Sequence, residues 1–179
     1  MWFIPFVAIA LGVIVLDQIS KQLILTHLFE DQLVLIPGVL NFTYVENRGM
    51  AFGLLSDQRW IFMILSVVGI ALVSIYRWFF VKGRLGRTAL SMIIGGGIGN
   101  MIDRVWLGYV VDFIDFCAFD FWVWVFNVAD AAVCVGAALF VLDLILETVR
   151  EFKAKRTTET AAPTANAPKG QEDSDAGDP

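Results

Sequence analysis

Four aspartates lie inside or at the edges of long apolar runs in this chain of 179 residues: Asp17, Asp103, Asp112 and Asp130. Hydrophobic residues make up 58% of the sequence and charged residues 17%, and the mean hydropathy is +0.70. This composition is too apolar for a soluble domain and indicates an integral membrane protein. An ionised carboxylate in hydrocarbon is costly, so such residues face a bundle interior or a wet cavity. The aspartates therefore outline a polar site inside an apolar protein.

The apolar runs predict an all-α integral membrane protein with four transmembrane helices, because a bilayer core requires about 20 residues per helix. We expect these helices at residues 2–25, 60–81, 89–102 and 121–146. The third is short and ends in polar residues, which indicates a helix that stops within the outer leaflet. The first lacks the basic start and the cleavage site of a signal peptide, so we expect it to be retained.

The positions of lysine and arginine predict how the helices are oriented in the membrane. The loop after the second span holds several bases and no acid, and a second basic block follows the fourth span. The positive-inside rule places both segments in the cytoplasm, together with both termini. The four aspartates then lie towards the outer face. Residues 1–153 are expected to form the transmembrane domain. Residues 154–179 have little apolar bulk beyond their first few positions and are expected to form a disordered cytoplasmic tail.

The first outer loop has the composition of a small β-sheet. Residues 32–46 are rich in β-branched and aromatic types and are interrupted once, by Pro37 and Gly38, which predicts a hairpin on the membrane surface. Residues 110–116 have a similar character. This second segment either joins the sheet or caps the third helix.

Two polar clusters near the first helix have simple structural explanations. Asp17 and Lys21 are four residues apart, so they share a helix face and can pair. A self-neutralised pair near the membrane interface explains these two residues as well as a functional role does. In the segment 47–53, Asn47 offers a donor and an acceptor, but its glycines favour a structural turn.

A glycine-rich segment ends the third predicted helix. Gly95 and Gly99 form a GxxxG step that lets a neighbouring helix approach closely. Packing does not explain the polar residues Asn100, Asp103 and Arg104 that follow. Nucleotide binding is a poor interpretation, because these glycines lie within a predicted membrane span and follow no predicted strand.

Two acids stand alone among apolar residues in the last third of the domain. Asp112 lies on the outer segment between bulky residues, and Asp130 has only Asn127, one turn earlier, as a polar neighbour. Either acid alone is open to an incidental explanation. Two acids that converge on one cavity fit a dyad in which one carboxylate takes a proton from water while the other keeps its own.

Five motifs occur in an order that resembles lipoprotein signal peptidase, also called signal peptidase II. They are Asp-Gln-x-Ser-Lys, Asn-Arg-Gly-x-Ala-Phe-Gly, Gly-Gly-x-x-Gly-Asn-x-x-Asp-Arg, Val-Val-Asp-Phe and Phe-Asn-Val-Ala-Asp. The resemblance covers about Leu16 to Gly136. Ser20 stands where this family often has threonine, and Met50 where it usually has a smaller residue. Neither position belongs to a proposed catalytic group.

The resemblance implies an aspartyl endopeptidase of the bacterial inner membrane that cuts a prolipoprotein before its diacylglyceryl-modified cysteine. It implies Asp112 and Asp130 as the catalytic dyad; Asp103 is the alternative partner, but the match places it beside Arg104 in a supporting role. The implied substrate-binding residues are Asn47, Gly49, Asn100, Arg104 and Asn127, and the implied supporting residues are Asp17, Lys21 and Asp103. The implied partners are the lipidated prolipoprotein, membrane lipids and a cyclic peptide inhibitor of the globomycin type.

No metal, cofactor or nucleic-acid partner is expected. The single histidine, His27, lies near the end of the first helix, where an interfacial role is the simpler interpretation. A proton-coupled transporter would also place aspartates in a membrane cavity. The absence of an evident internal repeat and the clustering of acids at the outer face count against it. A purely structural membrane protein would not need so many polar groups at lipid depth.

Overall fold

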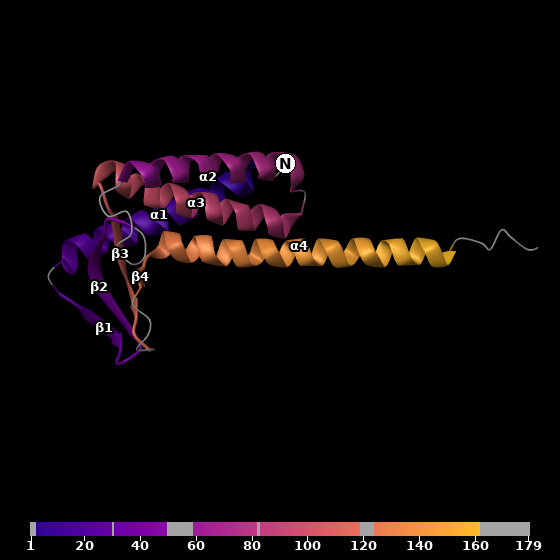
Figure 1. Cartoon of the computed structure of the whole chain (residues 1–179). Helices are drawn as coiled ribbons and strands as arrows, with labels where there is room; N and C mark the ends of the chain where they lie inside the picture. Colours follow the sequence, from indigo (N-terminus) through magenta and orange to yellow (C-terminus); the bar gives the residue numbers. More distant parts are fainter. Residues whose placement is uncertain (1–2, 30, 50–58, 82, 119–123, 162–179) are drawn as a thin grey trace, which may run out of the picture. The chain divides into compact units, whose positions relative to one another are not determined.

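The computed structural model describes residues 3–29, 31–49, 59–81, 83–118 and 124–161 (Figure 1). Its elements are α1 (Phe3–His27), β1 (Leu33–Ile36), β2 (Leu40–Asn47), α2 (Arg59–Phe80), α3 (Arg84–Trp106), β3 (Val110–Phe116), β4 (Val125–Phe126) and α4 (Val128–Ala161). The chain divides into two compact units, residues 1–144 and 145–179, and the candidate site lies entirely within the first.

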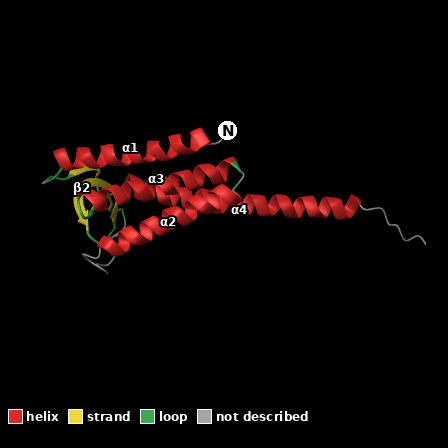
Figure 2. Cartoon of the chain, turned by 90° about the horizontal axis from the view of Figure 1, so that it is seen from above, coloured by secondary structure: helices red, strands yellow, loops and turns green. Residues whose placement is uncertain are grey.

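Within the described ranges, three helical segments are long and apolar enough to cross a membrane: Ile4–His27, Met63–Phe80 and Val128–Arg156. These correspond to the first, second and fourth predicted spans. The helix α3 is less apolar because it contains several glycines and charged residues. It lies beside α1 and α2, as Figure 2 shows, and the strands gather at one end of these helices.

Three consecutive glycines, Gly95–Gly97, bring α3 close to three different helices. A Cβ on the first would lie 2.8 Å from the carbonyl oxygen of Ala10 in α1. A Cβ on the second would overlap the carbonyl oxygen of Ala129 in α4, and one on the third would lie 3.1 Å from the side chain of Ile70 in α2. The sequence motif therefore serves close helix packing, and it places α3 in contact with all its helical neighbours.

The structure corrects the predicted bounds of the third and fourth helices. The third helix covers Arg84–Trp106 and not residues 89–102, because the basic and polar residues at its ends continue the helix. The fourth helix begins at Val128 and not at residue 121, because Val125–Phe126 pairs with β3. Its C-terminal end also differs: α4 continues to Ala161, beyond the expected start of the tail at residue 154. Residues 162–179 lie outside the described residues.

The strands form one antiparallel sheet in the order β1-β2-β3-β4. The hairpin predicted at Pro37 and Gly38 is confirmed: Gly38 has a φ of 72°, and the N–H of Val39 donates to the carbonyl of Ile36 at 3.0 Å. A positive φ suits glycine at this turn. The second segment, residues 110–116, joins the sheet as β3 and pairs with β2.

A small hydrophobic core joins the sheet to the end of α1. Ile24 of α1 packs with Val111 and Phe113 of β3, and all three are buried. Phe42 of β2 meets Phe113 edge to face, with ring centroids 5.6 Å apart. This packing fixes β3, and with it the residue between Val111 and Phe113, against the helices.

Candidate active site

The first turn of α4 is closed by reciprocal hydrogen bonds. The N–H of Asp130 donates to Asn127 Oδ1 at 2.8 Å, and the N–H of Asn127 donates to Asp130 Oδ2 at 3.3 Å. This is the geometry of a capping box, with Asn and Asp in the two side-chain roles. The N–H of Ala129 donates to Asp17 Oδ1 at 2.9 Å, so a residue of α1 also caps this turn. The turn that carries Asp130 is therefore held in place from two sides.

Asp112 lies on β3 opposite Val45 of β2 and is only 2% exposed. Its carboxylate accepts hydrogen bonds from two side-chain amides, Asn127 Nδ2 at 2.6 Å and Asn47 Nδ2 at 2.8 Å. Burial, reinforced by the negative charge of Asp130, raises the pKa of Asp112 to about 7, although the two amides act in the opposite direction. Asp112 is thus a buried acid that titrates near neutrality.

Asn127 joins the two aspartates directly. Its side-chain amide donates to Asp112, while its backbone N–H donates to Asp130. The side chain is fully buried, and its oxygen is held by the N–H of Asp130. Because the oxygen has this partner, the NH₂ group must point towards Asp112. The pair proposed as a dyad is therefore brought together by one residue.

Asn100 of α3 orients the other side of Asp130. Its Nδ2 donates to Asp130 Oδ1 at 2.7 Å. Its oxygen accepts hydrogen bonds from Lys21 Nζ at 3.0 Å and from Asn127 Nδ2 at 3.1 Å. These donors fix which way the amide faces, and the arrangement connects Lys21 to Asp130 through a single side chain.

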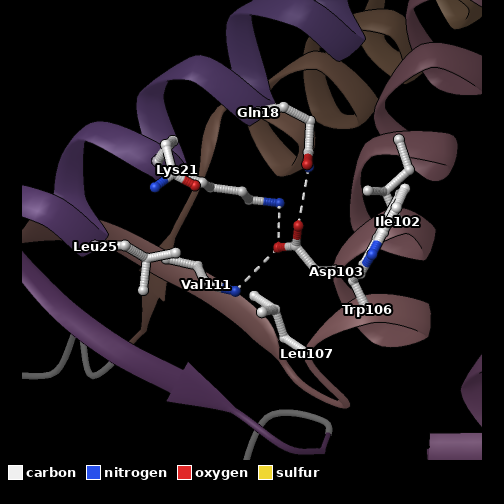
Figure 3. A pocket seen from close by; sticks show the side chains of 9 residues that line it. Gln18, Lys21, Leu25, Ile102, Asp103, Trp106, Leu107 and Val111 are labelled. Carbon is white, nitrogen blue, oxygen red and sulfur yellow. Dashed lines mark hydrogen bonds and ion pairs between the residues drawn. The ribbon is translucent and has the colours of Figure 1, made fainter.

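Lys21 is the centre of a buried ion-pair cluster. Its amine lies 2.8 Å from both Asp17 Oδ2 and Asp103 Oδ2, and these three side chains are at most 3% exposed. Gln18 Nε2 donates to Asp103 Oδ1 at 2.9 Å, and the N–H of Val111 donates to Asp103 Oδ2 at 3.1 Å. Figure 3 shows these groups converging on the Asp103 carboxylate. Asp103 thereby anchors β3 at the residue before Asp112.

The supporting residues predicted from the sequence thus lie in one network with Asp112 and Asp130. Asp103 was the alternative dyad partner, but its two oxygens bind Lys21, Gln18 and the backbone of β3. A residue of the second predicted cluster, Asn47, reaches Asp112. Asp17 and Lys21 do pair with each other, at 2.8 Å, and each has a further partner: Asp17 accepts the N–H of Ala129 in α4, and Lys21 donates to Asn100.

Comparison with known proteins identifies the family. The model of the family described as signal peptidase (SPase) II matches residues 9–146. This chain belongs to the signal peptidase II family. A lipoprotein signal peptidase of Halothermothrix orenii is 43% identical over 140 residues, which cover 76% of this chain and 92% of that protein. A lipoprotein signal peptidase of Halalkalibacterium halodurans is 41% identical over 150 residues, with coverage of 83% and 94%.

Solved structures agree with this membership. A bacterial membrane enzyme determined by the in meso method at 2.3 Å matches with a TM-score of 0.76 and 31% identity, over 83% of this chain and 92% of that one. Another, at 1.9 Å, matches with a TM-score of 0.74 and 32% identity, over 80% and 94%. Membership in the signal peptidase II family makes this chain a peptidase, and the apolar helices make it a multi-pass membrane protein.

The remaining predicted site residues lie at the edge of this network. The N–H of Gly49 donates to Asn47 Oδ1 at 3.2 Å, which orients the Asn47 amide towards Asp112. Arg104 Nη1 donates to the carbonyl of Asn100 at 3.3 Å, and its charge attracts Asp130. The rest of the second predicted cluster, Met50 to Gly53, lies outside the described residues.

The sequence offered no reason to assign a role in this hydrogen-bonded network to Gln18, Ala129 or the backbone of Val111. The first is part of the Asp-Gln-x-Ser-Lys motif, so its position one residue after Asp17 was an available signal. Backbone donors carry no such signal, because their identity is independent of residue type. A cavity beside the ion-pair cluster is lined by Gln18, Lys21, Gln22, Leu25, Ile102, Asp103, Trp106, Leu107 and Val111 (Figure 3).

Proposed function

We propose that this chain is an aspartyl endopeptidase that removes the signal peptide from diacylglyceryl-modified bacterial prolipoproteins by cutting before the lipidated cysteine. The observation that carries the proposal is the pair Asp112 and Asp130, two acids that share Asn127 as a hydrogen-bond donor. Membership in the signal peptidase II family and relatives named lipoprotein signal peptidase support the same reaction.

The chemistry follows from two nearby carboxyl groups that hold one proton between them. The ionised carboxylate accepts a proton from water as the water oxygen attacks the scissile carbonyl carbon. The protonated carboxyl donates a hydrogen bond and then its proton to the carbonyl oxygen, which gives a tetrahedral diol. The C–N bond then breaks, the leaving nitrogen takes a proton from the carboxyl that received it from water, and the diol returns its proton to the other carboxylate. The reaction as proposed needs no metal or cofactor.

The polar neighbours take two roles in this proposal. The amides of Asn47, Asn100 and Asn127 hold the aspartates through the hydrogen bonds described above. Such donors fix the carboxylates before substrate binds, which is worth more than contacts formed during the reaction. Gly49 and Arg104, at the edge of the network, contact the substrate backbone, while Asp17, Lys21 and Asp103 support the site.

The membrane arrangement is also a proposal. The helix α3 is the fourth membrane-crossing helix, packed by its glycines against the three more apolar ones. The basic residues that flank α3 on one side and follow the fourth span lie in the cytoplasm of a bacterial cell, with both chain termini. Asp112 and Asp130 then lie near the outer face of the inner membrane. Residues 1–153 are the peptidase domain, and the chain beyond α4 is a cytoplasmic tail without a catalytic role.

Cleavage of a purified diacylglyceryl-modified prolipoprotein in lipid, with a chelator present, tests the proposal. Asp112→Asn and Asp130→Asn should each abolish cleavage, because each keeps the shape of the side chain but cannot ionise. Asp115→Asn is the matched control: Asp115 lies on the same strand and pairs with Val125, away from the dyad. We expect it to retain cleavage. A globomycin-type cyclic peptide should inhibit the unmutated protein.

Activity in either dyad variant would remove that residue from catalysis. Cleavage of an otherwise identical precursor that lacks the diacylglyceryl group would contradict the assigned substrate class. If the folded, unmutated protein leaves the lipidated precursor intact, the peptidase assignment fails for this chain.

A further inference from the structure

The buried amine of Lys21 is linked to Asp130 through the side chain of Asn100. Its three nearest oxygens belong to Asp17, Asp103 and Asn100, at 2.8, 2.8 and 3.0 Å. An ammonium group has three donors, so these partners satisfy it completely. The bound Asn100 cannot turn its oxygen towards Asp130 without losing the lysine. The cation therefore compels the Asn100 amide to donate to Asp130 Oδ1.

The two aspartates differ in what surrounds them. Asp130 is partly exposed and stands in the first turn of α4, where the helix dipole favours a negative charge. It accepts one N–H from Asn100 and one from the backbone of Asn127. Asp112 lies in a strand, is 2% exposed, and accepts hydrogen bonds from the side-chain amides of Asn47 and Asn127. An ionised carboxylate is therefore stabilised more at Asp130 than at Asp112.

Other charged groups around Asp130 do not reverse this difference. On α1 and α3, the cations Lys21 and Arg104 match the carboxylates of Asp17 and Asp103 in number. Arg104 is attracted by Asp130 first, and by Asp112 and Asp103 less. Glu46 of β2 and Arg48, just after that strand, pair with each other at 2.6 Å. Both Lys21 and Arg104 also attract Asp112, so the difference between the two aspartates comes from the start of α4 and from the hydrogen bond with Asn100.

We propose that Lys21 is a positioning residue which, acting through Asn100, keeps Asp130 ionised, so that Asp130 takes the proton from water while the resting proton of the dyad sits on Asp112. This inference rests on the proposed function for its catalytic meaning. The location of the proton, however, is a property of the resting protein and can be measured without substrate.

Infrared difference spectra locate the proton. At about pH 6, the spectrum of the unmutated protein minus that of Asp112→Asn should contain the carbonyl band of a protonated carboxyl group. The difference with Asp130→Asn should contain the bands of an ionised carboxylate instead. The opposite pattern would overturn the assignment. Because both variants are isosteric and no cleavage is involved, this result is independent of whether the chain cuts a lipoprotein.

The role of Lys21 is tested by the acid limb of the pH profile of kcat/KM, which reports the base of the free enzyme. In the double variant Lys21→Met/Asp103→Asn, one positive and one negative charge are removed together. We expect the limb to move to higher pH by about one unit or more, a tenfold loss of rate on that limb. The control Asp103→Asn retains Lys21 and should show no upward shift. Lower rates at every pH with an unmoved limb would mean that Lys21 is merely structural, and would refute the proposal.

A third variant guards against failure of the double variant to fold. Asn100→Leu cuts the link between Lys21 and Asp130 but leaves the ion pairs of Lys21 with Asp17 and Asp103 in place. It should shift the acid limb in the same upward direction. An unshifted limb in this variant, with measurable cleavage, would also contradict the role of Lys21.

Discussion

Asn127 and Asp130 cap each other at the start of α4, through hydrogen bonds of 2.8 and 3.3 Å between the backbone of one and the side chain of the other. The same two residues belong to the proposed catalytic network, because the Asn127 amide also donates to Asp112. Helix initiation and the position of the proposed dyad therefore depend on the same residues but on different atoms of the Asn127 side chain, so substitutions here can separate the two roles.

Asn127→Ala should lower both stability and cleavage. It removes a helix cap, which costs about 0.5–2 kcal/mol, and a buried hydrogen bond to Asp112, which costs roughly 1–3 kcal/mol. Asn127→Ser keeps a capping oxygen but has no amide to bridge the dyad. We expect serine to restore much of the thermal stability and little of the cleavage rate. Equal recovery of both properties would show that Asn127 acts only as a cap.

The glycines of α3 should respond unequally to an added methyl group. Gly96→Ala should destabilise the protein and reduce cleavage, because its Cβ would overlap the carbonyl of Ala129 in the turn that carries Asp130. Gly69→Ala in α2 is the control, since nothing lies within 4 Å of its Cβ position, and alanine favours a helix over glycine by about 1 kcal/mol. Thermal unfolding in detergent measures the stability of both variants. An equally well tolerated Gly96→Ala would contradict the close approach of α3 and α4.

Asp112 should make the free energy of unfolding depend on pH. Its pKa rises from the ordinary 3.8 to about 7 in the folded protein, so the folded state binds this proton more tightly than the unfolded state. Stability from this group is full below about pH 4 and falls by roughly 1.4 kcal/mol per pH unit until about pH 7. Asp112→Asn lacks this loss, so its stability relative to the unmutated protein should rise across that window. If the difference in the free energy of unfolding between Asp112→Asn and the unmutated protein is the same at every pH, a raised pKa of Asp112 is excluded.

Cleavage should decline as the pH rises through about 7, because one member of the dyad must be protonated and Asp112 titrates there. The basic limb of kcat/KM against pH measures this. A rate that stays constant to about pH 9 would mean that the required acid is another group.

Removal of residues 162–179 should leave cleavage and membrane insertion unchanged. The segment is rich in small and polar residues and has almost no apolar bulk with which to pack against the domain. Activity and thermal stability of the shortened chain, compared with the full chain in the same lipid, are the measurements. Loss of either property would assign a role to these residues.

Local chemistry made several features predictable from the sequence. The Pro37-Gly38 pair signalled the hairpin, and the small residues of α3 signalled close packing. Isolated acids in apolar surroundings pointed to Asp112 and Asp130, which do lie in one hydrogen-bonded network.

Other features depend on contacts between distant residues. Hydropathy could not locate the start of α4, because Val125 and Phe126 are as apolar as a membrane span but form a strand with β3. The capping box was overlooked because Asn and Asp occupy roles in which Ser or Thr and Glu or Gln are more familiar. The hydrogen bonds of the Asn47 and Asn100 amides with Asp112 and Asp130 could not be read from the sequence, because only the tertiary structure reveals such partners.

The hydrogen bond from the N–H of Ala129 to Asp17 spans almost the whole domain, from the first helix to the last. Domains of nascent chains form from the N-terminal side, so α1 is made long before α4 exists. Until the final helix arrives, Asp17 lacks one of its partners and Asp130 has not yet been synthesised. A chain interrupted before α4 would therefore lack one member of the proposed dyad, so under this proposal proteolysis begins only when synthesis of the domain is complete.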